Sequence, residues 1–320
     1  MAGLVVLFVL HPHPNPYLRI MSPTARDLPS DIVAEVARFL PIDRLVQASF
    51  FPNAAPNVAQ YELRQRIKDA IEPYIERTAF DDFIEYLRAS EGAIVGSVVR
   101  EVLLLNGPTQ PRRKATNLNI TTSFGMEGVM RSFLRSQGYR SRALPPSERR
   151  SSSVDVIERF DRRTPCETRT ILLSVSATRA LSVVLCTPYS AQMCAITHNS
   201  VVCMLPRATL ANESLVVEGA PASSNAEDLT FSVIPNNSHW TSPCGLQCPA
   251  TWRKTPDDDG AAIYSWSMDD GQFTSWGSVE DDGRSFLRSE PLIWRVHSRC
   301  HNDHCPNKVL FEDRSRYLRP

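Results

Sequence analysis

Between residues 77 and 218 short apolar runs alternate with amphipathic segments, and this alternation constrains the fold more than any other feature. The run GAIVGSVVREVLLLN is typical of a strand that passes through a glycine into a helix. NLNITT and RTILLSVS have the residue types of further strands, whereas FDDFIEYLRAS and GMEGVMRSFLRSQGY have helical periodicity. Strands that alternate with helices pack as a sheet with helical layers, so residues 77–218 are predicted to form an α/β core.

The same patterns assign the remaining segments. SVDVIERF is predicted to be a strand, and ATRALSVVL and AQMCAIT are predicted to be helical. Residues 54–75 are predicted to form a longer helix with two distinct faces. The apolar face is expected to turn inward with Val58, Tyr61, Leu63 and Ile67, and the basic face outward with Arg64, Arg66 and Lys68.

A chain of 320 residues is long enough for more than one domain. Residues 22–76 are predicted to be a helical segment ahead of the core, and residues 219–320 an irregular, β-rich tail. Residues 1–21 contain the apolar run GLVVLFVL, which is too short to cross a membrane and lacks the basic residues of a signal peptide. We expect this stretch to be a disordered or spurious extension.

Charge and cysteine usage limit the function classes. Lys plus Arg and Asp plus Glu both number 35, so no overall charge favours nucleic acid or a membrane surface as partner. The eight cysteines lack the regular framework of a small secreted domain. Cys186, Cys194 and Cys203 lie in apolar surroundings and are expected to be buried. An intracellular protein, cytoplasmic or nuclear, is therefore expected.

The helical segment carries a short pattern of two amphipathic helices separated by Pro41. Its apolar positions are Leu28, Pro29, Ile32, Val36, Leu40, Leu45 and Val46. This pattern resembles an F-box, the motif that docks on the adaptor subunit of cullin–RING ubiquitin ligases. The resemblance implies a partly exposed patch that includes Leu28, Ile32, Val36 and Leu45. The spacing alone is equally compatible with a helical hairpin that packs on its own neighbour.

A second constellation joins Gly96-Ser97, at the turn from strand to helix, with Asn117 and Asn119 on the next strand. This order resembles the nucleotidyltransferase fold, in which the helix start faces phosphate and two carboxylates on that strand hold a divalent metal. Here both positions are amides, and RTILLSVS carries no third carboxylate; Asp155 is the nearest substitute. The resemblance therefore implies a degenerate pocket without catalysis. Gly96-Ser97 alone fits the turn of any α/β fold.

The combination of IVGS, NLNI, a Gly-Tyr helix end and a Cys-rich tail also resembles an uncharacterised F-box-like family of mushroom-forming fungi. That resemblance covers most of residues 26–310 and implies that the two amides are a trait of the family.

The tail contains two close cysteine pairs, Cys244 with Cys248 and Cys300 with Cys305, with three histidines near the second pair. Four cysteines in two pairs are typical of a tetrahedral zinc site, although the second spacing and the long intervening loop depart from the usual pattern. Disulfides and free thiols remain alternatives. No other cofactor is expected, and structural zinc is the one metal that the sequence suggests.

These observations favour a non-catalytic interaction protein, with protein partners that include the ligase adaptor subunit. Two alternatives are a nucleotide- or phosphate-binding protein without transferase activity and a zinc-stabilised binding scaffold. Nucleic acid is not an expected partner on the charge balance.

Overall fold

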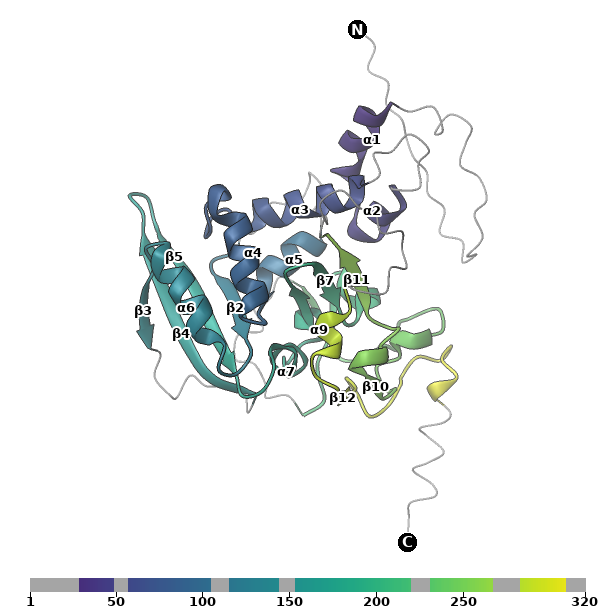
Figure 1. The fold of residues 1–320 in the computed structure, drawn as a ribbon. Coiled ribbons are helices and arrows are strands. Elements are labelled where there is room, and N and C mark those ends of the chain that lie inside the picture. Colours follow the sequence, from purple (N-terminus) through teal and green to yellow (C-terminus); the bar gives the residue numbers. More distant parts are fainter. Residues whose placement is uncertain are drawn as a thin grey trace.

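The computed structural model describes residues 29–48, 57–104, 115–143, 153–219, 231–266 and 283–308, which form a mixed α/β structure around one large sheet (Figure 1). The predicted extension over residues 1–21 lies outside these ranges, as does Leu28. None of the described helices is both long and apolar enough to cross a membrane.

The helices fall into two groups along the chain. The helices up to residue 136 are α1 Ser30–Ala37, α2 Ile42–Ala48, α3 Val58–Ile71, α4 Phe80–Ala89, α5 Ser97–Leu103 and α6 Glu127–Ser136. The later ones are the short α7 Ala180–Leu185, α8 Pro206–Leu210 and α9 Ser285–Arg288. Single 3-10 turns are η2 Arg77–Ala79, η4 Ser190–Gln192, η6 Gly245–Gln247 and η7 Thr255–Asp257.

The large sheet has the strand order β11-β7-β6-β1-β2-β5-β4-β3. Its strands are β1 Ala93–Val95, β2 Leu118–Thr122, β3 Arg140–Ala143, β4 Val154–Arg163, β5 Thr168–Ser176, β6 Cys194–Ile196, β7 Ser200–Cys203 and β11 Ala262–Ser265. Among these pairs only β2 and β5 run parallel, and all other neighbours are antiparallel. Because β11 joins β7, the C-terminal region contributes an edge strand to the sheet of the core.

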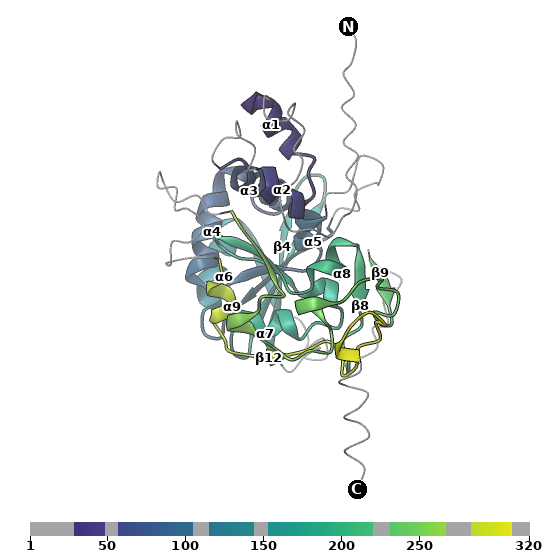
Figure 2. The same cartoon turned by 90° about the vertical axis from the view of Figure 1, so that its right-hand side faces the viewer.

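Two small ribbons complete the described strands. One pairs β8 Glu213–Leu215 with β9 Ser232–Ile234, and the other pairs β10 Arg253–Lys254 with β12 Ile293–Trp294. Figure 2 shows β8, β9 and α8 together with the last described segment, to one side of the large sheet.

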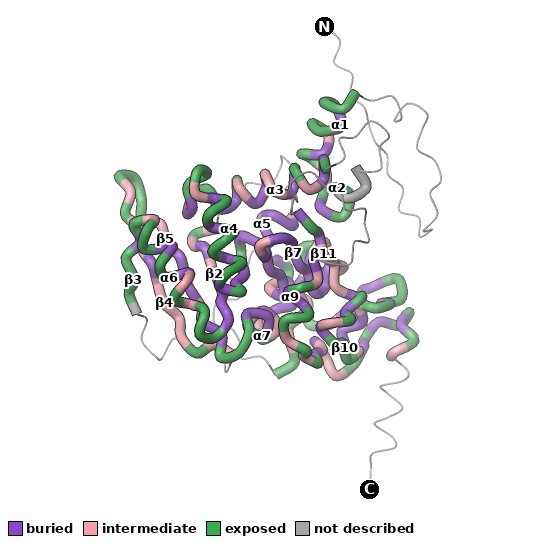
Figure 3. The backbone as a smooth tube through the Cα atoms, in the orientation of Figure 1, coloured by how far each residue is buried: buried purple, intermediate pink, exposed green. Residues whose placement is uncertain are grey.

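Alternation along the central strands places apolar side chains on both faces of the sheet. Ile94 and Ile196 belong to a cluster with helices α2 to α6, whereas Ala93 and Ala195 belong to a second cluster with α7 and α9. The central strands are therefore buried on both faces, while α1 is largely exposed (Figure 3).

The structure corrects the sequence assignment of AQMCAIT. Ser190–Gln192 forms a 3-10 turn, but Cys194–Ile196 is a strand rather than a helix. This strand pairs with β1 on one side and β7 on the other. A short apolar run has no decisive preference of its own, so pairing on both sides determines its conformation.

Helix α3 also departs from its predicted faces. Tyr61 is 54% exposed, whereas Arg66 is only 8% exposed. The Arg66 guanidinium donates to the carbonyl oxygens of Ala37 and Leu40, each at 2.8 Å, and pairs with Glu62 at 3.1 Å. An inward arginine thus satisfies the end of α1 and joins the α1–α2 turn to α3.

Candidate metal centre

Two distant segments meet at the C-terminal cysteines because the β10–β12 ribbon joins them. Arg253 pairs with Trp294, so the chain just after Cys248 lies beside the chain just before Cys300. The Pro249 carbonyl oxygen extends this pairing by accepting the backbone N–H groups of Val296 and His297, each at 3.0 Å. Ribbon pairing therefore brings both cysteine pairs to one place.

The four sulfurs form a compact group. Their Sγ atoms lie within 4.8 Å of one another, and all four cysteines are buried. The Sγ atoms of Cys244 and Cys300 are 3.8 Å apart, as are those of Cys248 and Cys305. A disulfide needs about 2.05 Å between its sulfurs, whereas zinc–sulfur bonds of about 2.3 Å place tetrahedral sulfurs roughly 3.8 Å apart. The spacing is compatible with a tetrathiolate metal site and too long for disulfides.

The histidines that the sequence places near the second cysteine pair are not part of this group. His301 and His304 are exposed, and the His297 Nε2 atom lies 2.7 Å from the carbonyl oxygen of Val216. Among the described residues the group that could hold a metal ion consists of the four cysteines.

The pKa values of the cysteines depend on hydrogen bonds between neighbouring sulfurs and on burial. The hydrogen bond between the Cys244 thiol and Cys248 raises the pKa of Cys244 and lowers the pKa of Cys248 to about 4. Burial raises the pKa of Cys300 to about 11. A metal must therefore displace protons to gain all four thiolates, so metal affinity is expected to increase with pH.

Buried amides surround the sulfurs. The Asn237 Nδ2 atom donates to the Sγ atoms of Cys244 and Cys300, both at 3.3 Å. The Asn302 Nδ2 atom donates to the Cys244 Sγ atom at 3.2 Å. Both asparagines are no more than 1% exposed. The Ala250 backbone N–H also donates to Cys248, so the sulfurs accept hydrogen bonds from side chains and backbone.

The cluster is anchored to helix α8. Ala208 of that helix and Trp240 belong to the same apolar group as the four cysteines. The Arg207 guanidinium lies 4.2 Å from the centre of the Trp240 ring and donates to the Pro243 carbonyl oxygen at 2.9 Å. The cysteine cluster is therefore packed against helix α8.

A buried ion pair lies under the β10–β12 ribbon. The Arg253 Nε atom donates to the Asp258 carboxylate at 2.7 Å, and both side chains are almost fully buried. The Trp294 indole N–H donates to the same carboxylate at 3.2 Å, and its ring lies 4.5 Å from the Arg253 guanidinium. Asp258 thus organises both strands of the ribbon.

The structure places Gly96, Asn117 and Asn119 together, as the sequence predicts. Val95 pairs with Asn119 across β1 and β2, and the Asn117 Nδ2 atom donates to the Asn119 Oδ1 atom at 2.8 Å. Gly96 has φ +81, and a Cβ there would lie 2.7 Å from the Asn119 Nδ2 atom, so the turn requires glycine. Ser97, the first residue of α5, is exposed.

Asp155 is not the carboxylate nearest to this pair. It lies at an irregularity near the start of β4, where Val154 pairs with Ser176. The strand register instead places Asp161 opposite Thr170, and Leu118 opposite Ile171. Asp161 accepts hydrogen bonds from Arg159 at 2.9 Å and from the Thr170 hydroxyl at 2.8 Å. Asp161, the closer of these two carboxylates, is thus already paired with Arg159.

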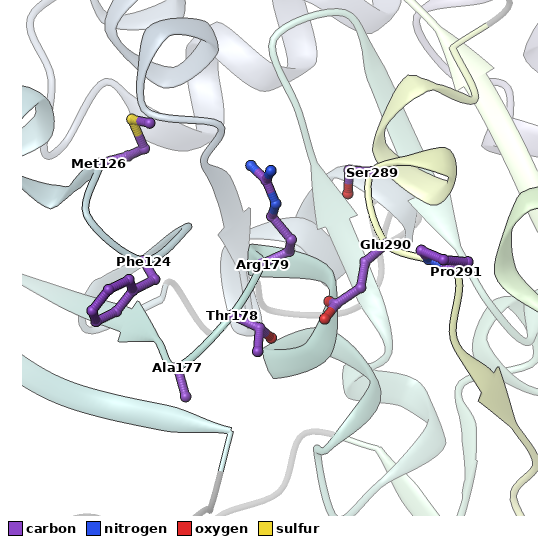
Figure 4. A pocket seen from close by; sticks show the side chains of 8 residues that line it. All are labelled: Phe124, Met126, Ala177, Thr178, Arg179, Ser289, Glu290 and Pro291. Atoms are coloured by element: carbon purple, nitrogen blue, oxygen red, sulfur yellow. The ribbon is translucent and has the colours of Figure 1, made fainter.

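A hollow of about 500 Å³ lies at the opposite end of β2, where the parallel strands β2 and β5 end (Figure 4). It is lined by Phe124, Met126, Ala177, Thr178, Arg179, Ser289, Glu290 and Pro291. Arg179 forms an ion pair with Glu91. This hollow is separate from the Gly96–Asn119 turn, which lies at the start of β2.

The predicted partner-binding residues divide between surface and core. Pro29 and Ile32 are exposed, Val36 and Leu40 are half-buried, and the side chain of Val46 lies outside the described set. Leu45 is 1% exposed, so the expectation that it belongs to an exposed patch is wrong. The buried residues of α1 are Val33 and Ala37, and Ala37 belongs to the apolar cluster of helices α2 to α6. Phe39 and Ile32, in contrast, are 72% and 44% exposed.

The remaining cysteines behave in two ways. Cys194 and Cys203 are buried as expected, on neighbouring strands with their Sγ atoms 3.4 Å apart. Cys186 is exposed, contrary to expectation, because it follows the short helix α7 at its open end.

Sequence reasoning missed Asn237 and Arg253, which surround the metal-ligating segment. Asn302 carried a signal, since it lies two residues after Cys300, but Asn237 is 63 positions away from that cysteine. No protein-family model and no curated protein matches this chain.

Proposed function

We propose that this chain is a non-catalytic interaction protein whose C-terminal segment is a binding scaffold stabilised by structural zinc. The observation that carries the proposal is the group of four buried sulfurs that lie within 4.8 Å of one another, with two of their separations at 3.8 Å. Four thiolates close the coordination shell of zinc and leave no position for a reacting water, which is the arrangement of structural sites. The metal content of the full chain tests the proposal, with about one zinc per chain expected.

The amide pair supports the absence of nucleotidyl transfer. Asn117 and Asn119 bond to each other and contribute no negative charge, and Asp161 is engaged by Arg159. Metal-dependent transfer needs carboxylates to hold the dication that neutralises the phosphates. The alternative of a phosphate-binding protein with its pocket at Gly96-Ser97 has weaker support, because Asn119 packs directly against Gly96.

We expect no nucleotide transfer when the chain is incubated with labelled nucleoside triphosphates, Mg²⁺ or Mn²⁺, and RNA or protein acceptors. Asn117→Asp combined with Asn119→Asp is the matched variant, and it should gain divalent-metal binding if these positions correspond to the carboxylate strand. Transfer by the wild-type chain that is lost on replacing Asn119 would contradict the proposal.

An F-box-type adaptor is the candidate form of the interaction function, and helix α1 favours it. The helix projects from the body of the protein (Figure 1). Ile32 on α1 is 44% exposed, Phe39 in the turn just after α1 is 72% exposed, and Val36 is half-buried. Large apolar side chains exposed on a projecting segment are typical of a surface that binds a partner. Because Leu45 is part of the core, the docking face we propose is built on α1 and the turn that follows it.

Replacing Ile32 and Phe39 together with alanine is expected to weaken co-purification with the adaptor subunit of a cullin–RING ligase by roughly 30-fold or more, since two exposed anchors are lost. The thermal midpoint should be unchanged because neither side chain is buried. Glu35→Ala, an exposed change on the same helix, is the control. If the wild-type chain binds no adaptor subunit, this form of the function is wrong.

A further inference from the structure

The donors around the four sulfurs are distributed unevenly. The Cys244 Sγ atom accepts the amides of Asn237 and Asn302, and the Cys300 Sγ atom accepts the amide of Asn237. The backbone N–H of Asn302 also donates to Cys300. The contacts of Cys305 are with other sulfurs, those of Cys248 at 3.8 Å and of Cys244. The Cys248 sulfur accepts from the Asn307 side chain, the Ala250 backbone and the Thr251 side chain, so among the described residues Cys305 is the cysteine of the cluster with the fewest donors to its sulfur.

Both asparagines are held so that their amide N–H groups face sulfur. The Asn237 Oδ1 atom accepts the His301 backbone N–H at 3.0 Å, and the Asn302 Oδ1 atom accepts the His304 backbone N–H at 2.9 Å. The Asn302 Nδ2 atom also donates to the Ser242 carbonyl oxygen at 2.8 Å. These contacts assign each amide oxygen to a donor and leave the nitrogen for the sulfurs.

We propose that Asn237 and Asn302 are positioning residues of the metal centre, which offset the negative charge on the Cys244 and Cys300 sulfurs. This inference depends on the proposed zinc site. A tetrathiolate around a dication keeps about two negative charges, and burying them without hydrogen-bond donors is costly. Groups that donate to metal ligands orient them and tune their basicity. Sulfurs that accept N–H bonds are therefore less nucleophilic than the Cys305 sulfur in the same centre.

The test is alkylation of the zinc-loaded full chain by N-ethylmaleimide, with the rate at each cysteine followed by peptide mass spectrometry. Asn237→Asp keeps the acceptor for His301 but replaces the donor with an anionic oxygen. We expect the rates at Cys244 and Cys300 to rise about tenfold or more relative to Cys305, the lower end of the effect that changes next to metal ligands have on metal affinity or activity. Asn237→Leu removes the donor without adding charge and should act in the same direction.

A cobalt-substituted sample gives a second readout that folding alone does not change. Loss of N–H donation should move the thiolate-to-cobalt absorption band to lower energy in both Asn237 variants. Asn236→Asp is the control. The Asn236 side chain is next to Asn237 in the chain, but it accepts from the Ser238 backbone N–H and does not donate to sulfur.

The outcomes separate the two proposals. A wild-type chain that binds neither zinc nor cobalt refutes the proposed function. A metal-loaded chain whose four cysteines react in unchanged proportion in both Asn237 variants refutes the role of the asparagines alone. A parallel rise at all four cysteines also refutes it, since that is the signature of general loosening.

Discussion

Replacing Cys248 with serine, or removing the metal with a strong chelator, is expected to unfold the C-terminal segment around Trp240 and Trp294. Cys248 is fully buried, and its sulfur is one of four that would share the ion. Structural zinc contributes apparent binding energies of about 10–16 kcal/mol in small zinc domains, which is comparable with the whole stability of a typical domain at about 5–15 kcal/mol. The β10–β12 ribbon has few residues of its own to replace that energy.

The measurement is metal content together with tryptophan fluorescence and thermal unfolding of the full chain. Cys166→Ser is the matched control, because that cysteine is exposed and outside the cluster. Wild-type protein that contains no metal and melts at the same temperature with and without chelator would contradict the prediction. A Cys248→Ser variant that unfolds at the same temperature as the wild type would also contradict the prediction.

Replacing Asp258 with alanine is expected to lower the free energy of unfolding by about 3–5 kcal/mol, because it leaves the buried Arg253 guanidinium without its counter-ion. Asp258 is 2% exposed and accepts from Arg253, the Trp294 indole and the Gly260 backbone N–H. Burial already lowers the pKa of Arg253, which Asp258 opposes by favouring the charged form.

Urea unfolding followed by fluorescence measures the change. The neighbouring Asp259 is exposed and pairs with Arg284 at 3.2 Å, so Asp259→Ala should cost no more than about 1 kcal/mol. Equal destabilisation by the two variants would contradict a special role for the buried pair. The Asp258→Asn variant, which keeps an acceptor but loses the charge, should lie between them.

Much of the core was predictable because its signals are local. The glycine between β1 and α5 lies where a positive φ is needed, and Gly138 with φ +80 follows α6. The strands at NLNI, SVDVIERF and RTILLSVS and the helices at residues 80–89 and 127–136 follow from periodicity. Neighbouring residues supply these signals, so a single sequence contains them.

Predictions failed where distant segments decide the environment. Arg66 is buried because the α1 carbonyls lie above it, and Leu45 is buried because α3 and α5 lie beneath α2. Cys194–Ile196 becomes a strand because two strands flank it. In each case residue type was compatible with more than one environment, and the partner came from another part of the chain.

The candidate metal centre likewise has features that the sequence predicts and features that only the fold determines. The sequence by itself determined the four cysteines as candidate ligands, their grouping in two pairs, and the neutral amides at Asn117 and Asn119. Only the tertiary structure decided that the two cysteine pairs meet, that the nearby histidines stay outside, and that Asn237 reaches two sulfurs. The physical reason is that the 51 residues between Cys248 and Cys300 leave their separation open until β10 pairs with β12 and Arg253 and Asp258 are buried beneath that ribbon.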